Sequence, residues 1–311
     1  MTNYPMGWRV GRICMAALIA ALGLAAPARV DAQVTAYAYV LRPGASELLV
    51  IDTRTRAIVG TGIAVGTTSY SALPTPDGRR VYVGGFGNGT VRVLDAVTNT
   101  FIGAPIAVQN NPYGMGITPD GRKVYVANSG NSSMSVIDTA TNTATTVAAG
   151  GVSPATPTVS PDGTRVYLPL FGSNTLAVFD TATDMMIGAP LALGCANPLY
   201  ATFTLNGQRA YISCYVGDNL KVIDVATTTI ATTINGLNGA RDSVLTRDGS
   251  KLFVGSFFEG NNLFVVDVAT NTLLPTLTPA ASPASVAITP DGTTLYTTNA
   301  LANSLLSLIH I

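Results

Sequence analysis

The sequence predicts an all-β fold, a seven-bladed β-propeller of four-stranded antiparallel blades, from three observations. A Thr/Ser-Pro-Asp-Gly turn or a close variant recurs six times, with steps of 42 to 44 residues between its glycines. An aspartate that ends an apolar run repeats with the same period. One aromatic residue stands at an equivalent place in each of seven units. A period in the forties with short strands is typical of propellers.

These three markers define the units. The turn glycines are Gly78, Gly121, Gly163, Gly207, Gly249 and Gly292. The aspartates that end apolar runs are Asp52, Asp95, Asp138, Asp180, Asp224 and Asp267. The aromatic residues are Tyr39, Tyr82, Tyr125, Tyr167, Tyr211, Phe253 and Tyr296. Proline presets φ at the first turn corner and glycine accepts positive φ, so Pro-Asp-Gly should join the innermost strand of each blade to the second. We expect the aromatics to fill the gaps between sheets and the repeat aspartates to be structural.

Residues 1–32 read as a signal peptide, which leaves residues 33–311 for the propeller domain. Arg9 and Arg12 precede an apolar run over residues 13–26, and Val30-Asp31-Ala32 supplies a small-x-small cleavage site. The run is shorter than the ~20 residues that a bilayer-spanning helix needs. We therefore expect no transmembrane segment in the mature chain, and a periplasmic, secreted or cell-surface location.

The order of strands predicts an incomplete last blade. The mature chain begins on the second strand of its first unit, at residues 36–41, and ends on the third strand of its last unit. A fourth strand for the last unit and an innermost strand for the first are missing, so we expect truncation at the C-terminus. The last six residues also match a translated library adapter, which would make His310 non-native.

Charge and cysteine content limit the partners and the redox state. Removing three arginines and one aspartate with the leader from 17 basic and 17 acidic residues leaves 14 and 16. This balance argues against nucleic acid as a partner. Cys195 and Cys214 remain, and an oxidising compartment favours a disulfide between them. Two packed, unpaired thiols are the alternative.

Three segments resemble the YVTN-family β-propeller repeat. They are residues 124–128, with the sequence Val-Tyr-Val-Ala-Asn, residues 295–299, and the Val-Ile-Asp-Thr-Ala-Thr-Asn-Thr run at residues 136–143. Tryptophan-aspartate repeats are excluded because Trp8 is the only tryptophan. The resemblance implies an exported bacterial or archaeal protein, with lactonase-type propellers and propeller subunits of amine dehydrogenases as fold relatives. It brings no family-wide catalytic residue.

The sequence offers little for catalysis or metal binding. His310 is the single histidine, so a Ser-His-Asp arrangement and histidine ligation of zinc or haem have no member to supply the imidazole. Outside the repeat positions and the leader the acids are Glu47, Asp184, Asp218, Asp242 and Glu259. Of these we expect only Asp242 near the central channel. We therefore expect no catalytic residue, no metal and no cofactor.

The variable loops supply a candidate binding rim. Aligned on the turn glycines, the rim positions hold aromatic residues and one Arg/Asp pair. These residues are Tyr70, Tyr113, Tyr200, Arg241, Asp242, Phe86, Phe171, Tyr215 and Phe257. Variable loops on a rigid scaffold commonly bind ligands, and aromatic rings give large contact area at low entropy cost. Alternatively, the rings only cap the core and the Arg/Asp pair is internal.

These observations favour a non-enzymatic exported scaffold that binds an unknown protein or small-molecule ligand at the channel mouth. Two alternatives remain open. A lactonase-type hydrolase would need an acidic or metal-bearing mouth, and a propeller subunit of a cofactor-dependent dehydrogenase would need a large exposed apolar patch.

Overall fold

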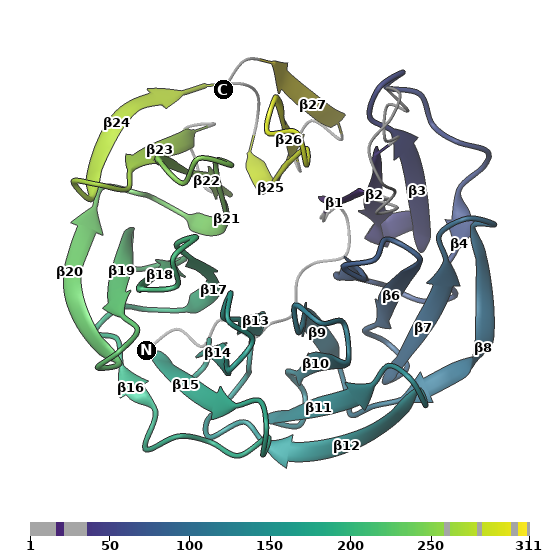
Figure 1. Ribbon diagram of the computed structural model, residues 1–311, viewed down its shortest axis with the longest axis horizontal. Helices are drawn as coiled ribbons and strands as arrows, with labels where there is room; N and C mark the ends of the chain where they lie inside the picture. The colour runs from purple at the N-terminus through teal and green to yellow at the C-terminus, as the bar shows by residue number, and fades with distance from the viewer. Residues whose placement is uncertain (1–16, 22–35, 258–261, 279–281, 300–303, 310–311) are drawn as a thin grey trace, which may run out of the picture.

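Seven antiparallel sheets stand as blades around a central axis (Figure 1). The computed structural model describes residues 17–21, 36–257, 262–278, 282–299 and 304–309. Within these residues six sheets have four strands and the seventh has three. The seven-bladed propeller predicted from the repeat period is thus the observed fold.

Each blade follows the chain from the axis outward, so strands that are consecutive in sequence are hydrogen-bonded neighbours. Blade 1 contains β1 (Ala17–Ala21), β2 (Ala36–Arg42), the 3-10 turn η1 (Pro43–Ala45), β3 (Glu47–Asp52) and β4 (Ile63–Ala64). Blade 2 contains β5 (Ala72–Pro74), β6 (Arg80–Gly85), β7 (Thr90–Asp95) and β8 (Thr100–Ala107). Blade 3 contains β9 (Pro112–Ile117), β10 (Lys123–Asn128), β11 (Ser133–Asp138) and β12 (Thr143–Ala148). Blade 4 contains β13 (Thr158–Val159), β14 (Arg165–Leu170), β15 (Thr175–Asp180) and β16 (Leu191–Ala192).

The remaining blades repeat this order. Blade 5 contains β17 (Pro198–Phe203), β18 (Arg209–Cys214), β19 (Asn219–Asp224) and β20 (Thr229–Asn235). Blade 6 contains β21 (Ala240–Leu245), β22 (Lys251–Ser256), β23 (Leu263–Asp267) and β24 (Thr272–Leu277). Blade 7 contains β25 (Pro283–Ile288), β26 (Thr294–Asn299) and β27 (Ser304–Ile309).

The innermost strand of blade 1 differs from the expected strand order. β1 pairs with β2 from Ala17↔Val40 to Ala21↔Ala36. The sequence reading assigns β1 to the signal peptide and gives the first unit no innermost strand. The structure fills that position with β1. The cleavage site before Gln33 lies outside the described residues, as does His310, so removal of the leader and a non-native His310 stay predictions.

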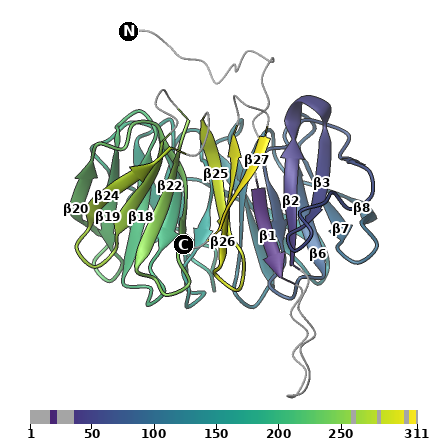
Figure 2. The same ribbon diagram turned by 90° about the horizontal axis from the view of Figure 1, so that it is seen from above.

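The propeller has two faces, which Figure 2 shows from the side. Turns that join the first to the second strand and the third to the fourth strand carry the repeat aspartates, and we call their side the turn face. The opposite side, where the innermost strands begin, is the mouth face. Because strands alternate in direction, each blade contributes the same kinds of loop to each face.

Apolar side chains of neighbouring blades form the core. One cluster joins Tyr39 and Leu48 of blade 1 to Val81 and Leu94 of blade 2. Successive side chains of a strand point to opposite faces of its sheet. Each blade has a neighbour on either side, so the side chains on both of its faces pack against another sheet. The core is therefore a ring of inter-blade layers.

The repeat tyrosines fasten neighbouring blades. Their rings are buried. Four of the hydroxyls donate hydrogen bonds to the turn between the third and fourth strands of the next blade. The bonds run from Tyr82 to Asn142 Oδ1 (3.2 Å), Tyr125 to Asp184 Oδ1 (2.8 Å), Tyr211 to Asn271 Oδ1 (2.7 Å) and Tyr296 to Thr53 O (3.1 Å). The last of these bonds links blade 7 to blade 1 and so closes the ring. The aromatics fill the inter-blade gaps, as the sequence predicts.

Candidate functional site

β-Bulges interrupt the innermost strands of four blades on the mouth face. In blade 6, Ala240 pairs with Ser256 and Ser243 with Val254, so two residues stand opposite Gly255 alone. The residues at these bulges are Tyr113 and Gly114 in blade 3, Leu199 in blade 5, Arg241 and Asp242 in blade 6, and Ala284 in blade 7. A bulge changes the direction of the side chains it carries. The candidate residues Tyr113, Arg241 and Asp242 therefore lie on irregular backbone.

A cavity of about 110 Å³ opens at the mouth face. Residues from blades 2 to 7 line it: Tyr70, Ser71, Ala72, Leu73, Tyr113, Gly114, Met115, Thr156, Leu199, Tyr200, Arg241, Asp242 and Ser285. A second, smaller cavity of about 30 Å³ shares Tyr113, Leu199 and Arg241 with it. The two cavities form adjoining parts of one site.

Close approach of blades 3 and 4 shapes the wall at Gly114. A Cβ atom at Gly114 would lie 2.6 Å from the Thr156 Cα and 2.5 Å from its Oγ1. No side chain fits there without moving the neighbouring backbone. Glycine at this bulge therefore allows Thr156 to reach the cavity.

Aromatic rings form one side of the site. The Tyr70 and Tyr113 ring centroids are 5.9 Å apart at an angle of 39°. Phe86 meets Tyr70 edge to face, with the centroids 4.9 Å apart. Phe171 and Tyr215 line the smaller cavity. Such contacts fix ring positions and leave apolar faces beside polar hydroxyls.

One cation and one acid lie next to each other on β21. The Arg241 guanidinium carbon is 5.4 Å from the Phe257 ring centroid, a cation–π contact. The Arg241 carbonyl accepts a 2.5 Å hydrogen bond from the Ser213 hydroxyl, which holds the bulge against blade 5. Asp242 Oδ1 accepts from the Ser243 N–H at 2.9 Å, and Oδ2 accepts from the Val286 N–H of blade 7 at 3.3 Å.

The Asp242 carboxyl group has an unusual proton affinity. Burial raises its pKa to about 7, against the lowering effects of the Val286 N–H, the Arg241 charge, the Ser243 N–H and the Ser285 hydroxyl. Burial, together with the Asp242 charge, also raises the pKa of the Tyr200 hydroxyl. Asp242 thus exchanges a proton near neutral pH, while Tyr200 keeps its proton.

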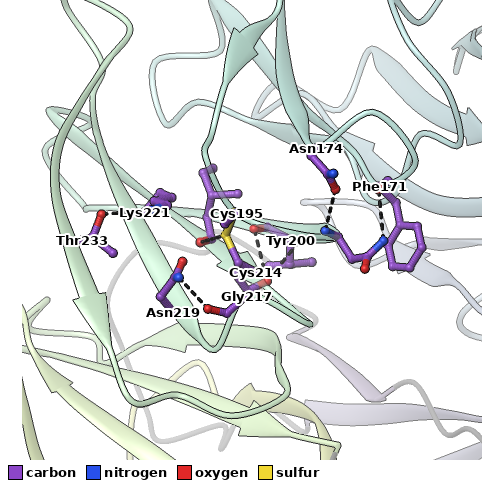
Figure 3. The surroundings of a disulfide bond; sticks show 12 residues. Phe171, Asn174, Cys195, Tyr200, Cys214, Gly217, Asn219, Lys221 and Thr233 are labelled. Carbon is purple, nitrogen blue, oxygen red and sulfur yellow. Dashed lines mark hydrogen bonds between the residues drawn. A yellow bond between two sulfur atoms is a disulfide. The ribbon is translucent and has the colours of Figure 1, made fainter. Parts of the chain in front are cut away.

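A disulfide holds the loop that enters β17 (Figure 3). Cys195 and Cys214 are joined with an S–S distance of 2.01 Å and a Cα–Cα distance of 6.0 Å. Asn197, between Cys195 and β17, makes two hydrogen bonds to blade 4. Its backbone N–H donates to Asn174 Oδ1 at 2.8 Å, and its side-chain amide donates to Phe171 O at 3.2 Å. This loop leads directly into the cavity residues Leu199 and Tyr200. The bonds restrain that wall of the site.

The structure brings all nine rim residues predicted from sequence to the two cavities. Seven line a cavity, while Phe86 packs on Tyr70 and Phe257 lies beneath Arg241. Sequence reasoning did not single out Leu199, Thr156 or Ser285 as cavity residues.

The other acids lie elsewhere or outside the described residues. Asp184 pairs with Lys123 at 2.8 Å between blades 3 and 4, and Glu47 pairs with Arg42 at 3.0 Å. Asp218 is exposed in a loop of blade 5, and Glu259 lies outside the described residues. Within the described ranges, no group of three or more His, Cys, Asp or Glu side chains is placed to hold a metal ion.

Two further features of the described residues concern a membrane span and an exposed apolar patch. None of its helices has the length and apolar character to cross a bilayer. Three consecutive apolar side chains, Met185, Met186 and Ile187, are exposed in the outer segment of blade 4. The exposed run therefore lies at the propeller's periphery rather than at the mouth.

Solved structures share the fold. A chain of Kuenenia stuttgartiensis hydrazine synthase matches with a TM-score of 0.79 and 20% identity, over 88% of this chain and 92% of that chain. A functionally unknown protein from Desulfotomaculum acetoxidans DSM 771 matches with a TM-score of 0.76 and 17% identity, over 88% and 92%. No protein-family model and no curated protein matches the sequence. At these identities the likeness establishes the propeller fold, and the resemblance to the YVTN repeat stays a prediction.

Proposed function

We propose that the protein is an exported, non-enzymatic binding propeller whose ligand occupies the cavity at the mouth face. The observation that carries this proposal is that innermost-strand bulges, aromatic rings and the Arg241/Asp242 pair lie together around the cavities at the mouth face. Bulges beside binding sites commonly redirect side chains toward a ligand. The disulfide-restrained loop supports a site that is formed before its ligand arrives.

A retention experiment tests this proposal. The wild-type protein and the Tyr113→Ala/Arg241→Ala double variant are incubated with culture extract and separated from unbound material. Mass spectrometry then identifies the small molecules and proteins retained. We expect the wild type to retain a component that the double variant loses, with both melting temperatures close to each other.

The Arg122→Ala variant is the matched control, because Arg122 is an exposed arginine on the turn face. It should retain the same component as the wild type. Equal retention by the double variant and the wild type would refute binding at the mouth.

Asp242 favours a second candidate, a hydrolase of the lactonase type. A carboxyl group with a pKa of about 7 in a cavity suits a general base that takes a proton from water. Hydrolysis of a panel of lactones should then rise with pH through about 7, as Asp242 ionises. Asp242→Asn should lower kcat/KM by roughly 100-fold or more. The absence of any lactone hydrolysis by the wild type would remove this candidate.

A further inference from the structure

The Asp242 carboxylate is held from the protein side and faces a cavity with aromatic walls. Its two oxygens accept backbone N–H bonds from Ser243 and Val286, which fix the position of the group. The side chain is partly exposed and lines the larger cavity. Tyr70 and Tyr113 line the same cavity, and so does Tyr200 from the neighbouring blade. The site therefore combines one fixed carboxylate with several π faces.

The charges around Asp242 leave room for a positive group in the cavity. Arg241 is the one cation among the described residues that line the cavity. Its charge lowers the pKa of Asp242 but does not outweigh the effect of burial, and its guanidinium lies over the Phe257 ring. The facing groups on β17 and β25 are the Tyr200 hydroxyl, the Ser285 hydroxyl and the Val286 N–H, all without positive charge. Across the cavity stand the Tyr70 and Tyr113 rings. A cation in the cavity would offset the cost of burying the ionised carboxylate.

We infer that the mouth cavity recognises an organic ammonium group, with Asp242 accepting its N–H bonds and the rings of Tyr70 and Tyr113 contacting its carbon frame. Charge-assisted bonds to a carboxylate are among the stronger hydrogen bonds in proteins. Ammonium groups also bind the faces of aromatic rings. A primary amine attached to a small ring or chain meets both demands. This inference rests on the proposed binding function and names its ligand class.

Three probes of similar size and different charge test the inference. Benzylammonium, benzyl alcohol and benzoate are titrated into the purified protein by calorimetry at pH 8 and pH 6. We expect benzylammonium to bind at least about tenfold more tightly than either other probe at pH 8. Its affinity should fall about tenfold at pH 6, because Asp242 then takes up a proton while the probe stays charged.

Two isosteric variants sharpen the test. Asp242→Asn should remove both the preference for benzylammonium and the pH dependence of its affinity. Asp218→Asn makes the same change at an exposed loop residue and should bind like the wild type. If Asp242→Asn does not fold, the probe series and the pH dependence of the wild type still decide the outcome.

The other outcomes separate the inference from the proposed function. Tight binding of benzyl alcohol or benzoate that Tyr113→Ala abolishes would overturn the ammonium inference and leave a binding mouth. Failure of all three probes to bind would also overturn the ammonium inference, while the retention experiment would decide the binding function independently.

Discussion

The repeat aspartates of the turn face and Asp242 of the mouth face have pKa values that are shifted in opposite directions. On the turn face, all eleven repeat aspartates have pKa values below the ordinary value. On the mouth face, the pKa of Asp242 is raised to about 7. The direction of the pKa shift therefore depends on whether hydrogen bonds or desolvation dominate at the carboxyl group.

Hydrogen bonds explain the turn face. Asp248 accepts from the Thr246 hydroxyl at 2.6 Å and from the Ser250 N–H at 3.0 Å, and these bonds lower its pKa to about 2. At Asp77, burial raises the pKa, but the bonds from the Thr75 hydroxyl and the Arg79 N–H outweigh it. The ionised carboxylates close their turns and stabilise the fold.

Desolvation explains the mouth face. Asp242 also accepts two backbone N–H bonds, but burial of its carboxyl group dominates. Burial makes the ionised form of Asp242 unfavourable, so this carboxyl group does not stabilise the fold in the way the ionised turn aspartates do. Asp242 thus differs from the repeat aspartates both in its place, on a bulge outside the repeat pattern, and in the direction of its pKa shift.

The largest expected effect concerns the disulfide on the mouth face. Replacing both Cys195 and Cys214 by serine should lower the free energy of unfolding by about 2 to 4 kcal/mol, because the bridge restricts the unfolded chain. It should also weaken ligand retention, since the loop leading to Tyr200 loses its restraint. Urea unfolding measures the first effect. An unchanged unfolding midpoint would contradict the stabilising role.

The pH dependence of stability distinguishes the two faces directly. The folded-state pKa of Asp242 lies above its unfolded value, so its contribution is full below pH 4 and is lost as pH rises toward 7. Between pH 5 and pH 8 this should cost the wild type roughly 2 to 3 kcal/mol. In Asp242→Asn the stability should change much less over this range. Equal slopes in the two proteins would contradict the raised pKa.

The turn aspartates should show the reverse dependence. Their folded-state pKa values are lowered, so their contribution is present above the unfolded pKa of about 4 and is lost as pH falls toward 2. Thermal unfolding between pH 5 and pH 2 should therefore show a steady fall in melting temperature. A melting temperature that stays constant to pH 2 would count against this role.

The smallest expected effect is that of a single turn. Asp120→Ala removes the acceptor of the Thr118 hydroxyl (2.6 Å) and of the Arg122 N–H (3.0 Å). The cost should be about 1 kcal/mol, because the carboxylate is partly in water. Ligand retention should remain unchanged. A loss of retention without unfolding would mean that the turn face also binds.

The fold could be predicted from sequence because every unit repeats the same local rules. Gly121 has φ +71°, and the turn around it needs glycine there for steric reasons. Tyr125 occupies the same buried place as its six counterparts, which a fixed spacing reveals. The innermost strand of blade 1 is harder to predict, since residues 17–21, which pair with β2, also match the apolar pattern of a leader.

The site could be predicted only in part. Alignment on the turn glycines brought Tyr113 and Asp242 to the mouth, because each lies a fixed number of residues before a turn. The bulges could not be predicted from the repeat spacing, because the step to the turn glycine is 42 residues both for blade 6, which has a bulge, and for blade 4, whose β13 and β14 pair in register. The hydrogen bond from the Val286 N–H to Asp242 joins two residues that are 44 positions apart in the sequence, so it depends on how neighbouring blades pack. Burial, which sets the pKa of Asp242, follows from that packing as well.

The most direct test of the difference between the faces is an NMR titration of the aspartate side-chain carboxyl carbons. We expect Asp242 to titrate with a midpoint near pH 7 and the eleven repeat aspartates to titrate below their ordinary pKa. An Asp242 midpoint within the range of the repeat aspartates would contradict this expectation.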